Sequence, residues 1–253
     1  MNIKDLQKNW DELGKRDPFW AILTCPEKKG KWDTDEFFAT GKREIDLVME
    51  YIKSLGLNIP RRKALDFGCG VGRLTKPLAD YFDEVCGVDI APSMIELANK
   101  YNQCDRCKYY LNEANDLKLF SDYSFDFIYT SLTLQHMEPQ YSKNYMKEFL
   151  RILVPDGLLI FQLPGKKKAI NTITKNSKKT IKQTIKKIIP RIILNVYCKV
   201  KYGGVMEGYG IKREDVVEFL KQNGAKVADI QTCPPAIGST GNWVNFRYCI
   251  TKK

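Results

Sequence analysis

Three glycines stand at alternate positions in one stretch of this chain, directly after a short apolar run that contains an acid. The run spans residues 64–67, its acid is Asp66, and the glycines are Gly68, Gly70 and Gly72. A helix-like segment follows. This order predicts a strand, a tight turn and a helix N-terminus. Such a turn lets a ligand approach the backbone closely, because a Cβ atom at the glycine positions would block it.

The glycine spacing also restricts the chemistry of that ligand. The dinucleotide fingerprint is Gly-x-Gly-x-x-Gly, which here would require a glycine at Arg73. The third glycine of this chain, Gly72, comes one residue early. A pyrophosphate would also be repelled by the nearby carboxylate of Asp66. The turn therefore favours a ligand that carries positive charge.

A second run, Glu84–Asp89, ends in an acid about 20 residues after the first glycine, the span of one strand-helix-strand unit. A carboxylate at the end of this strand can accept hydrogen bonds from both hydroxyls of a ribose. A helix is expected to start after Ala91, with Pro92 in its first turn. Nicotinamide enzymes carry the same acid, so Asp89 alone does not separate the two cofactor classes.

The pattern Asp-x-Gly-x-Gly-x-Gly at residues 66–72, with Gly-Val-Asp-Ile at 87–90, resembles the class I S-adenosylmethionine-dependent methyltransferases of the methyltransferase-11 type. The resemblance covers residues 62–163. It implies S-adenosylmethionine as cofactor, which carries a sulfonium and an ammonium group and no phosphate. The implied cofactor-binding residues are Asp66, Gly68, Cys69, Gly70, Asp89, Ile90, Met94, Asn112, Glu113, Ala114 and Ser131. Asn112 and Glu113 depart from the usual Gly-Asp pair of the family.

The stretch Leu-Gln-His-Met at residues 134–137 follows the expected fourth strand and resembles that of many small-molecule methyltransferases. Its histidine, His136, is the only one in the chain. An imidazole with an ordinary pKa near 6.5 can remove a proton from an alcohol at neutral pH, which makes His136 the candidate catalytic base. The alternative is that His136 only caps or packs the loop. Gln135, Trp20 and Tyr209 are weaker candidates for contacts with the substrate.

Strands and helices alternate along the chain, which predicts a doubly wound α/β sheet. The resemblance implies a Rossmann-like, mostly parallel, seven-stranded sheet with helices on both faces and an antiparallel last strand. The expected strands are 64–67, 84–89, 108–111, 125–130, 158–163, 226–230 and 244–250. We expect residues 1–60 to form an aromatic-rich helical extension or lid, and residues 61–253 to form the methyltransferase domain.

Composition and cysteine usage are those of a soluble, reduced protein. There is no signal peptide pattern and no apolar run of about 18 residues, so we expect a cytoplasmic protein. Cys104 and Cys107 have zinc-ligand spacing, but no second cysteine pair matches them, and we expect no metal.

The net charge of +11 comes from one segment. No Asp or Glu occurs between Gly157 and Met206, whereas twelve Lys and Arg do. We expect a basic helical insertion at about 165–205. Three roles compete: a lid over the substrate, a helix on an anionic membrane through residues 166–201, or an RNA contact. RNA is the weakest, because the segment has only Tyr197 for base stacking.

These patterns predict methyl transfer from S-adenosylmethionine to a small-molecule or glycan acceptor, at oxygen, by in-line displacement. No Asn-Pro-Pro-Tyr or Asp-Pro-Pro-Tyr follows the fourth strand, which disfavours nucleic acid as the acceptor. Two alternatives remain: a nicotinamide-dependent oxidoreductase, and a non-catalytic cofactor-binding module associated with the inner face of a membrane. The oligomeric state and the acceptor stay open.

Overall fold

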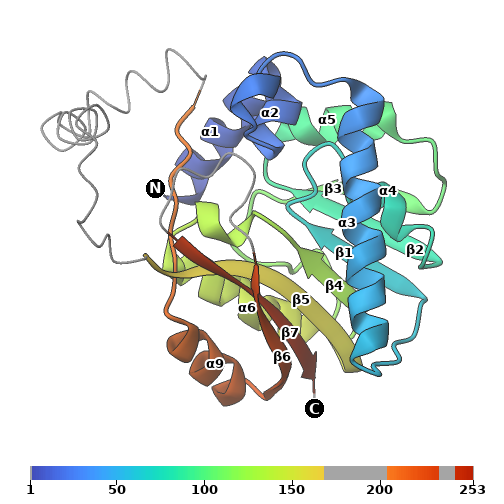
Figure 1. The fold of residues 1–253 in the computed structure, drawn as a ribbon, viewed down its shortest axis with the longest axis vertical. Coiled ribbons are helices and arrows are strands. Elements are labelled where there is room, and N and C mark those ends of the chain that lie inside the picture. The colour runs from blue at the N-terminus through green and yellow to red at the C-terminus, as the bar shows by residue number, and fades with distance from the viewer. Residues whose placement is uncertain (1, 168–203, 234–242, 253) are drawn as a thin grey trace, which may run out of the picture.

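The computed structural model describes residues 2–167, 204–233 and 243–252. These residues build a seven-stranded sheet in the order β3-β2-β1-β4-β5-β7-β6 (Figure 1). The five strands from β3 to β5 pair in parallel, and β7 is antiparallel to both of its neighbours. The predicted fold class is therefore confirmed. The strands are β1 Lys63–Phe67, β2 Glu84–Asp89, β3 Cys107–Leu111, β4 Phe125–Thr130, β5 Leu153–Lys167, β6 Ala225–Cys233 and β7 Trp243–Lys252.

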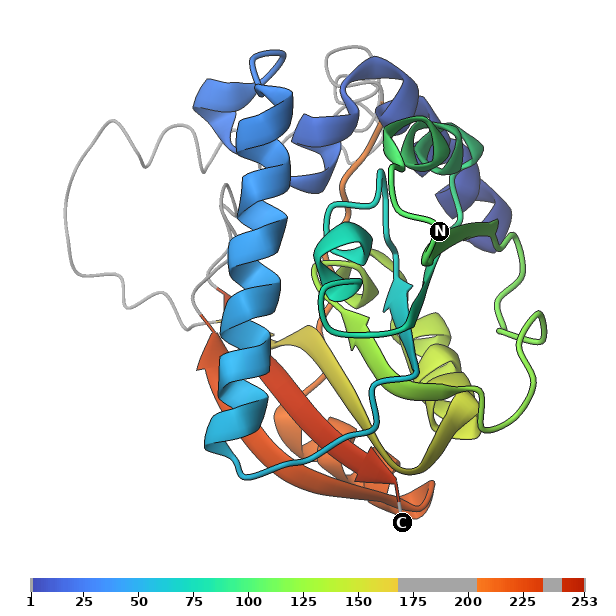
Figure 2. The same cartoon turned by 90° about the vertical axis from the view of Figure 1, so that its right-hand side faces the viewer.

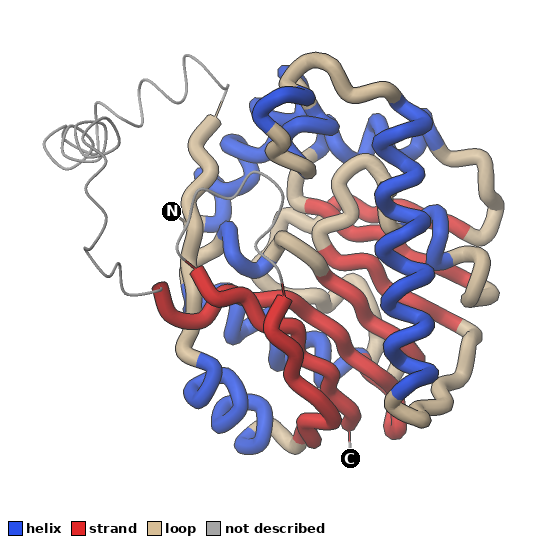
Figure 3. The backbone as a smooth tube through the Cα atoms, viewed as in Figure 1, coloured by secondary structure: helices blue, strands red, loops and turns tan. Residues whose placement is uncertain are grey.

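Helices cover both faces of this sheet. The long helix α3 runs along one face, and α6 and α9 lie on the other (Figures 1 and 2). Figure 3 shows the strands as an inner layer between these helices. The described α-helices are α1 Ile3–Arg16, α2 Pro18–Ile22, α3 Thr34–Ser54, α4 Thr75–Leu78, α5 Pro92–Tyr101, α6 Pro139–Ile152 and α9 Arg213–Gln222. None of the described helices is long and apolar enough to cross a membrane.

The sequence explains why these elements form. Every residue of β4 is buried, as expected for a parallel strand covered on both faces. Helix α3 presents Ile45, Val48 and Ile52 to the sheet, and these side chains are at most 2% exposed. Its N-terminus is capped by Asp33, whose carboxylate accepts a hydrogen bond from the Glu36 amide at 3.0 Å. The start of the sheet is thereby fixed against a rigid helix.

The N-terminal segment of the chain is helical. Helices α1 and α2 lie above the carboxyl ends of the central strands, while α3 descends along the sheet (Figure 1). Most of the predicted basic helical insertion falls in 168–203, outside the described residues. The lid, membrane and RNA interpretations of that segment therefore stay predictions.

Candidate active site

The glycine turn follows β1 and has the backbone conformation that only glycine adopts readily. Gly68, Gly70 and Gly72 have φ angles of +76°, +53° and +85°. A Cβ atom on Gly68 would lie 2.2 Å from the Thr133 hydroxyl, and one on Gly70 would lie 2.5 Å from the Ile22 side chain. Side chains from α2 and from the loop after β4 therefore occupy the space that glycine leaves free.

The amides of this turn are already used within the protein. The Gly68 and Cys69 amides donate to the Val88 carbonyl at 2.7 and 3.0 Å. The Gly70 amide donates to Asp89 Oδ2 at 2.8 Å. A pyrophosphate needs free amide donors at such a turn, and these three are not free. The geometry thus suits a cofactor without phosphate, as the glycine spacing predicted.

A cavity opens above the turn. The space inside its outline, open solvent included, is about 790 Å³. Seven of the predicted cofactor residues line it: Gly68, Gly70, Asp89, Ile90, Met94, Asn112 and Ser131. They come from the ends of β1, β2, β3 and β4, the crevice where open α/β sheets bind their ligands. His136, the predicted base, lines the same cavity. The cofactor and catalytic predictions therefore converge on one space.

Asp89 ends β2 and holds two backbone amides. Oδ2 accepts from Gly70, and Oδ1 accepts from Ala91 at 2.9 Å. Burial raises the pKa of this carboxyl, and the hydrogen bonds from the Ala91 and Gly70 amides oppose that shift. A carboxylate oxygen can accept more than one hydrogen bond, so both oxygens keep capacity for a pair of hydroxyl groups. Asp89 fits the recognition of a ribose.

Asp66, a predicted cofactor contact, does not line the cavity. Its side chain is 1% exposed and accepts a hydrogen bond from the Thr75 hydroxyl at 2.6 Å. Side chains alternate along a strand, so Asp66 points under the turn whereas Phe67 faces the cavity. Burial raises the pKa of Asp66 to about 7. Cys69 also misses the cavity, because its thiol is buried within the turn.

The loop after β3 contributes Asn112 but neither of its neighbours. Asn112 is 7% exposed, and its amide donates to the Asp116 carbonyl at 2.8 Å, which shapes the loop. Glu113 is exposed, and its carboxylate accepts a hydrogen bond from Gln7 of α1. The Ala114 carbonyl accepts a hydrogen bond from the Tyr145 hydroxyl at 2.7 Å. Glu113 and Ala114, both predicted cofactor contacts, do not line the cavity.

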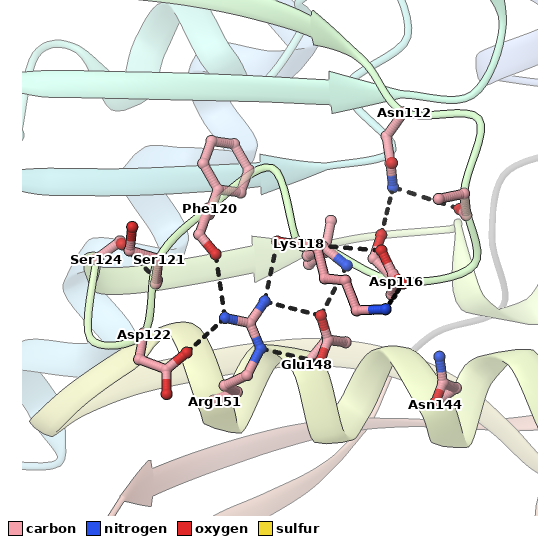
Figure 4. A network of polar contacts seen from close by, with 12 residues as sticks. Asn112, Asp116, Lys118, Phe120, Ser121, Asp122, Ser124, Asn144, Glu148 and Arg151 are labelled. Carbon is pink, nitrogen blue, oxygen red and sulfur yellow. Dashed lines mark hydrogen bonds and ion pairs between the residues drawn. The ribbon is translucent and has the colours of Figure 1, made fainter.

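Arg151 of α6 holds this loop in place (Figure 4). Its guanidinium donates to the carbonyls of Leu117 and Phe120 at 2.9 and 3.1 Å. It also pairs with Asp122 at 2.7 Å and with Glu148 at 2.8 Å. One side chain therefore fixes two carbonyls and two carboxylates, and the loop that begins at Asn112 is anchored on a helix.

His136 lies in a short 3₁₀ helix after β4 and has two polar partners. Its Nδ1 is 2.8 Å from the Glu207 carbonyl, and its Nε2 is 3.1 Å from the Gln135 amide nitrogen. A carbonyl only accepts, so Nδ1 carries the proton and Nε2 of the neutral ring presents its lone pair. Burial lowers the pKa of His136, and the hydrogen bond to Glu207 opposes this effect. The ring is thus held neutral and oriented.

None of the three predicted substrate contacts lines the cavity, and two of them support His136. Gln135 donates to the imidazole, as described above. The Tyr209 amide donates to the Gln135 carbonyl at 2.7 Å, and its hydroxyl donates to the Glu207 carboxylate. Trp20 lies apart from them, with the Lys29 ammonium 5.0 Å from its ring centre. Gln135 and Tyr209 therefore hold the loop after β4 in place.

The sequence predicted a helical extension or lid over residues 1–60, but not which of its residues reach the cavity. The apolar cover consists of Ile3, Leu6 and Trp10 of α1 and Ala21 and Ile22 of α2. The Trp10 ring packs edge-on against His136, with 5.0 Å between ring centres. Asn9 and Val205 exchange two hydrogen bonds, at 2.9 and 2.7 Å, which fasten α1 to the segment that carries Glu207.

A buried ion pair, which the sequence also did not reveal, connects α3 to the glycine turn. Arg73 is 3% exposed and pairs with Glu44 at 2.8 Å. The second oxygen of Glu44 accepts a hydrogen bond from the Tyr129 hydroxyl at 2.8 Å. The position at which a dinucleotide enzyme would need glycine is therefore occupied by a structural arginine.

Residues 65–161 match the family model described as a methyltransferase domain. The matched range contains the glycine turn, Asp89 and His136. The match shows that the chain contains a methyltransferase domain, and the sheet order and the solved structures described below show the fold of class I S-adenosylmethionine-dependent methyltransferases. S-adenosylmethionine is the methyl donor of this class, and the residues around the cavity fit it.

The curated relatives act on different acceptors. The chain is 32% identical over 134 residues to the sterol 4-C-methyltransferase of Caenorhabditis elegans, which is 49% of this chain and 39% of that protein. It is 30% identical over 138 residues to phosphoethanolamine N-methyltransferase 1 of Zea mays, 52% of this chain and 26% of that protein. A tRNA N(3)-methylcytidine methyltransferase of Drosophila melanogaster is 31% identical over 165 residues, 62% of this chain and 50% of that protein. The chain thus spans half the length or less of these three relatives.

Solved structures share the fold. Magnesium protoporphyrin IX methyltransferase from Synechocystis, with bound S-adenosylhomocysteine, superposes with a TM-score of 0.65 at 17% identity over the full length of both chains. An S-adenosylmethionine-dependent methyltransferase from Clostridium acetobutylicum gives a TM-score of 0.57 at 15% identity, covering 82% of this chain and 89% of that one. The fold does not support the nicotinamide alternative. A dinucleotide-binding sheet has the strand order 3-2-1-4-5-6, whereas here the antiparallel strand β7 lies between β5 and β6.

Proposed function

We propose that this chain transfers the methyl group of S-adenosylmethionine to an oxygen of a small-molecule or glycan acceptor by in-line displacement. The observation that carries the proposal is that Asp89 and His136 line the same cavity. Asp89 is suited to bind a ribose, and His136 is suited to accept a proton. When bound, the cofactor supplies an electrophilic methyl group. The residues of the chain then have to orient the acceptor and accept its proton.

His136 performs the proton transfer in this proposal. Its Nδ1 proton is held by the Glu207 carbonyl, so the lone pair on Nε2 is available in the direction now taken by the Gln135 amide. An acceptor hydroxyl that replaces this amide would meet a neutral imidazole. Alignment of the reacting atoms provides further rate, because methyl transfer requires the nucleophile, carbon and sulfur in line.

We propose oxygen as the methylated atom because of the candidate base His136, and not because of the atoms that the relatives methylate. By their names, the relatives methylate carbon of a sterol and nitrogen of phosphoethanolamine and of cytidine. An amine nucleophile has a lone pair once it is deprotonated, whereas an alcohol gains most from a base within hydrogen-bond reach. A histidine that is held neutral suits the alcohol.

A labelled-methyl transfer screen tests the proposal. Full-length chain and S-adenosylmethionine with a labelled methyl group are incubated with sugars, lipid-linked glycans, small acids and RNA. We expect label in a small-molecule or glycan product. His136→Ala should lower turnover by about 100-fold with cofactor affinity unchanged. The matched control is Gln140→Ala, an exposed residue at the start of α6. Full activity of His136→Ala would remove the base role, and label in RNA alone would overturn the acceptor class.

We further propose that residues 166–201 bring the enzyme to an anionic surface at the inner face of the membrane. The support is the run of twelve basic residues without an acid between Gly157 and Met206. Flotation with vesicles that contain phosphatidylserine should recover the chain, and vesicles of phosphatidylcholine should not. Replacing Lys182, Lys186 and Lys187 with Gln should abolish recovery. Replacing Lys100, Lys118 and Lys226, which are exposed elsewhere, should not. Equal recovery of both variants would contradict the contact.

A further inference from the structure

A row of polar side chains crosses the α3 face of the sheet beside the cavity. Thr130 pairs with Phe161 in register, and Gln162 pairs with Arg247. Ser131, which follows Thr130 and lines the cavity, is therefore the neighbour of Gln162. Side chains on a strand alternate between faces, so Ser131, Gln162 and Arg247 share the face on which α3 packs. Two strand spacings put the Arg247 backbone about 10 Å from Ser131.

Arg247 differs from the other buried arginines of the described chain. Arg73 and Arg151 each pair with a glutamate at 2.8 Å. Arg247 is half-buried, and its described contact is the Tyr51 ring, 5.9 Å from the guanidinium carbon. Within the described residues it forms no ion pair. By sequence, segments 168–203 and 234–242 contain no Asp or Glu that could supply one. The carboxylates of Glu44 and Asp229 act on the same tyrosines as Arg247, but among the described residues neither forms an ion pair with it. A partly desolvated cation without a direct carboxylate partner favours a ligand that supplies one.

Asn245 adds an unsatisfied polar group on the same face. It lies two residues before Arg247 on β7 and is 4% exposed. Its side-chain oxygen has no hydrogen-bond partner among the described residues. A buried amide oxygen without a donor costs about 1–3 kcal/mol, so this position favours a ligand that brings an O–H or N–H.

The charge of Arg247 reaches its neighbours on adjoining strands. Burial raises the pKa of the Tyr129 hydroxyl and of the Cys233 thiol, and in both cases Arg247 opposes the rise. The guanidinium therefore projects its positive field across β4, β7 and β6. An anion placed among these side chains would meet a preorganised cation beside the cavity.

We propose that Arg247 and Asn245 form an acceptor subsite that binds an anionic group, carboxylate or phosphate, together with a neighbouring hydroxyl or amine of the acceptor. The inference rests on the proposed function, because it names the acceptor class of that methyl transfer. Because two strand spacings, about 10 Å, separate the Arg247 backbone from Ser131 at the cavity, the acceptor would extend from the cavity towards β7. The acceptor is then a small acid or a phosphorylated or acidic sugar.

A binding measurement tests the subsite without relying on catalysis. Phenyl phosphate and benzoate are titrated into the full chain in the presence of S-adenosylhomocysteine, and their relaxation is followed by ligand-observed NMR, with benzyl alcohol as the neutral probe. We expect at least one anion to bind and the alcohol not to bind. Preference between the two anions distinguishes a phosphate acceptor from a carboxylate one. Binding of neither anion would overturn the proposal.

Two variants assign the binding to Arg247. Arg247→Gln should weaken anion binding at least 10-fold, and Arg247→Lys should recover part of it, since Lys keeps the charge but not the fork of donors. Arg213→Gln is the matched control, because Arg213 lies 5.8 Å from the Phe246 ring on the opposite face of the same strand. Thermal unfolding verifies that each variant is folded. Equal binding by Arg247→Gln and the wild type would overturn the assignment.

The transfer assay separates this inference from the proposed function. Absence of labelled product from every acceptor contradicts the proposed methyl transfer. The subsite is then tested by the anion-binding experiment alone. Labelled product from neutral acceptors, with no preference for acidic ones, contradicts the subsite and supports methyl transfer. We expect acidic acceptors to have a kcat/KM at least 10-fold higher than that of neutral acceptors, and we expect Arg247→Gln to lose this preference.

Discussion

His136 carries the account at the scale of single residues. The Glu207 carbonyl fixes the proton on Nδ1, Trp10 packs against the ring edge-on, and the Gln135 amide marks the position of the free lone pair. All three contacts orient the imidazole without charging it. Burial adds to this, because it lowers the pKa of His136 and keeps the ring neutral at neutral pH.

The pH profile of methyl transfer follows from that shift. The neutral imidazole is the active form, and its pKa lies below the ordinary value of 6.5. We expect kcat to stay constant at neutral pH and to fall as the pH drops through the lowered pKa. In His136→Gln the residual rate should lose this acidic limb. An acidic limb of the same position in the variant would assign it to another group.

Asp66 gives a prediction about stability. The folded chain keeps the proton on this carboxyl up to about pH 7, whereas an ordinary aspartic acid releases it near pH 3.8. In this window the folded state binds more protons, so the Asp66 contribution to the free energy of unfolding decreases as pH rises. Asp66→Asn does not titrate. Its stability relative to the wild type should therefore increase by up to roughly 4 kcal/mol between about pH 4 and pH 7.

Urea unfolding at a series of pH values measures this difference. Asp83→Asn serves as control, because Asp83 is an exposed acid just before β2. The control should follow the wild type at every pH. A constant offset between Asp66→Asn and the wild type would show that Asp66 is ionised in the folded chain across this range.

At the scale of elements, the site depends on how loops are held between strands and helices. The loop after β3 begins with Asn112 at the cavity and is tied to α6 by Arg151 (Figure 4). The loop after β4 includes Leu132, a non-glycine residue with a φ of 61°. Such strain is maintained by the surrounding contacts and is common at functional sites. The helices α1 and α2 then cover the cavity.

Arg151→Met tests the first of these supports. Loss of the hydrogen bonds to Leu117 and Phe120 and of the pair with Glu148 should lower the free energy of unfolding by about 2 kcal/mol. Affinity for S-adenosylmethionine should fall several-fold, because the Asn112 loop loosens. Lys147→Met is the control, since Lys147 lies on the same helix and contacts only the Phe219 ring in the described structure. Unchanged cofactor affinity in Arg151→Met would show that the Asn112 loop does not contribute to cofactor binding.

Local patterns in the sequence predicted most of the elements and half of the site. The glycine turn, the acid at Asp89 and the buried runs of β1 and β4 are signalled by neighbouring residues, and the structure places them as expected. The Asp66 side chain lies under the turn and not at the cavity, because side chains alternate between the two faces of β1 and the sequence does not say which face adjoins the cavity. The covering of His136 by Trp10 joins residues more than a hundred positions apart, and no local periodicity carries that information.

In the whole molecule, the parallel and antiparallel parts of the sheet carry different groups of site residues. The parallel half, from β3 to β5, forms the cavity at its carboxyl edge. The antiparallel strand β7 carries Arg247 and Asn245, the proposed acceptor subsite. Outside the basic segment between Gly157 and Met206, acidic and basic residues nearly balance.

Calorimetric titration of S-adenosylmethionine tests the central claim, that the cavity between Asp89 and His136 is the cofactor site. The wild type should bind one S-adenosylmethionine per chain, S-adenosylhomocysteine should displace it, and NADH should give no heat. Asp89→Ala should abolish binding, while Asp83→Ala, just before the other end of the same strand, should bind like the wild type. Binding that persists unchanged in a folded Asp89→Ala variant would contradict the account.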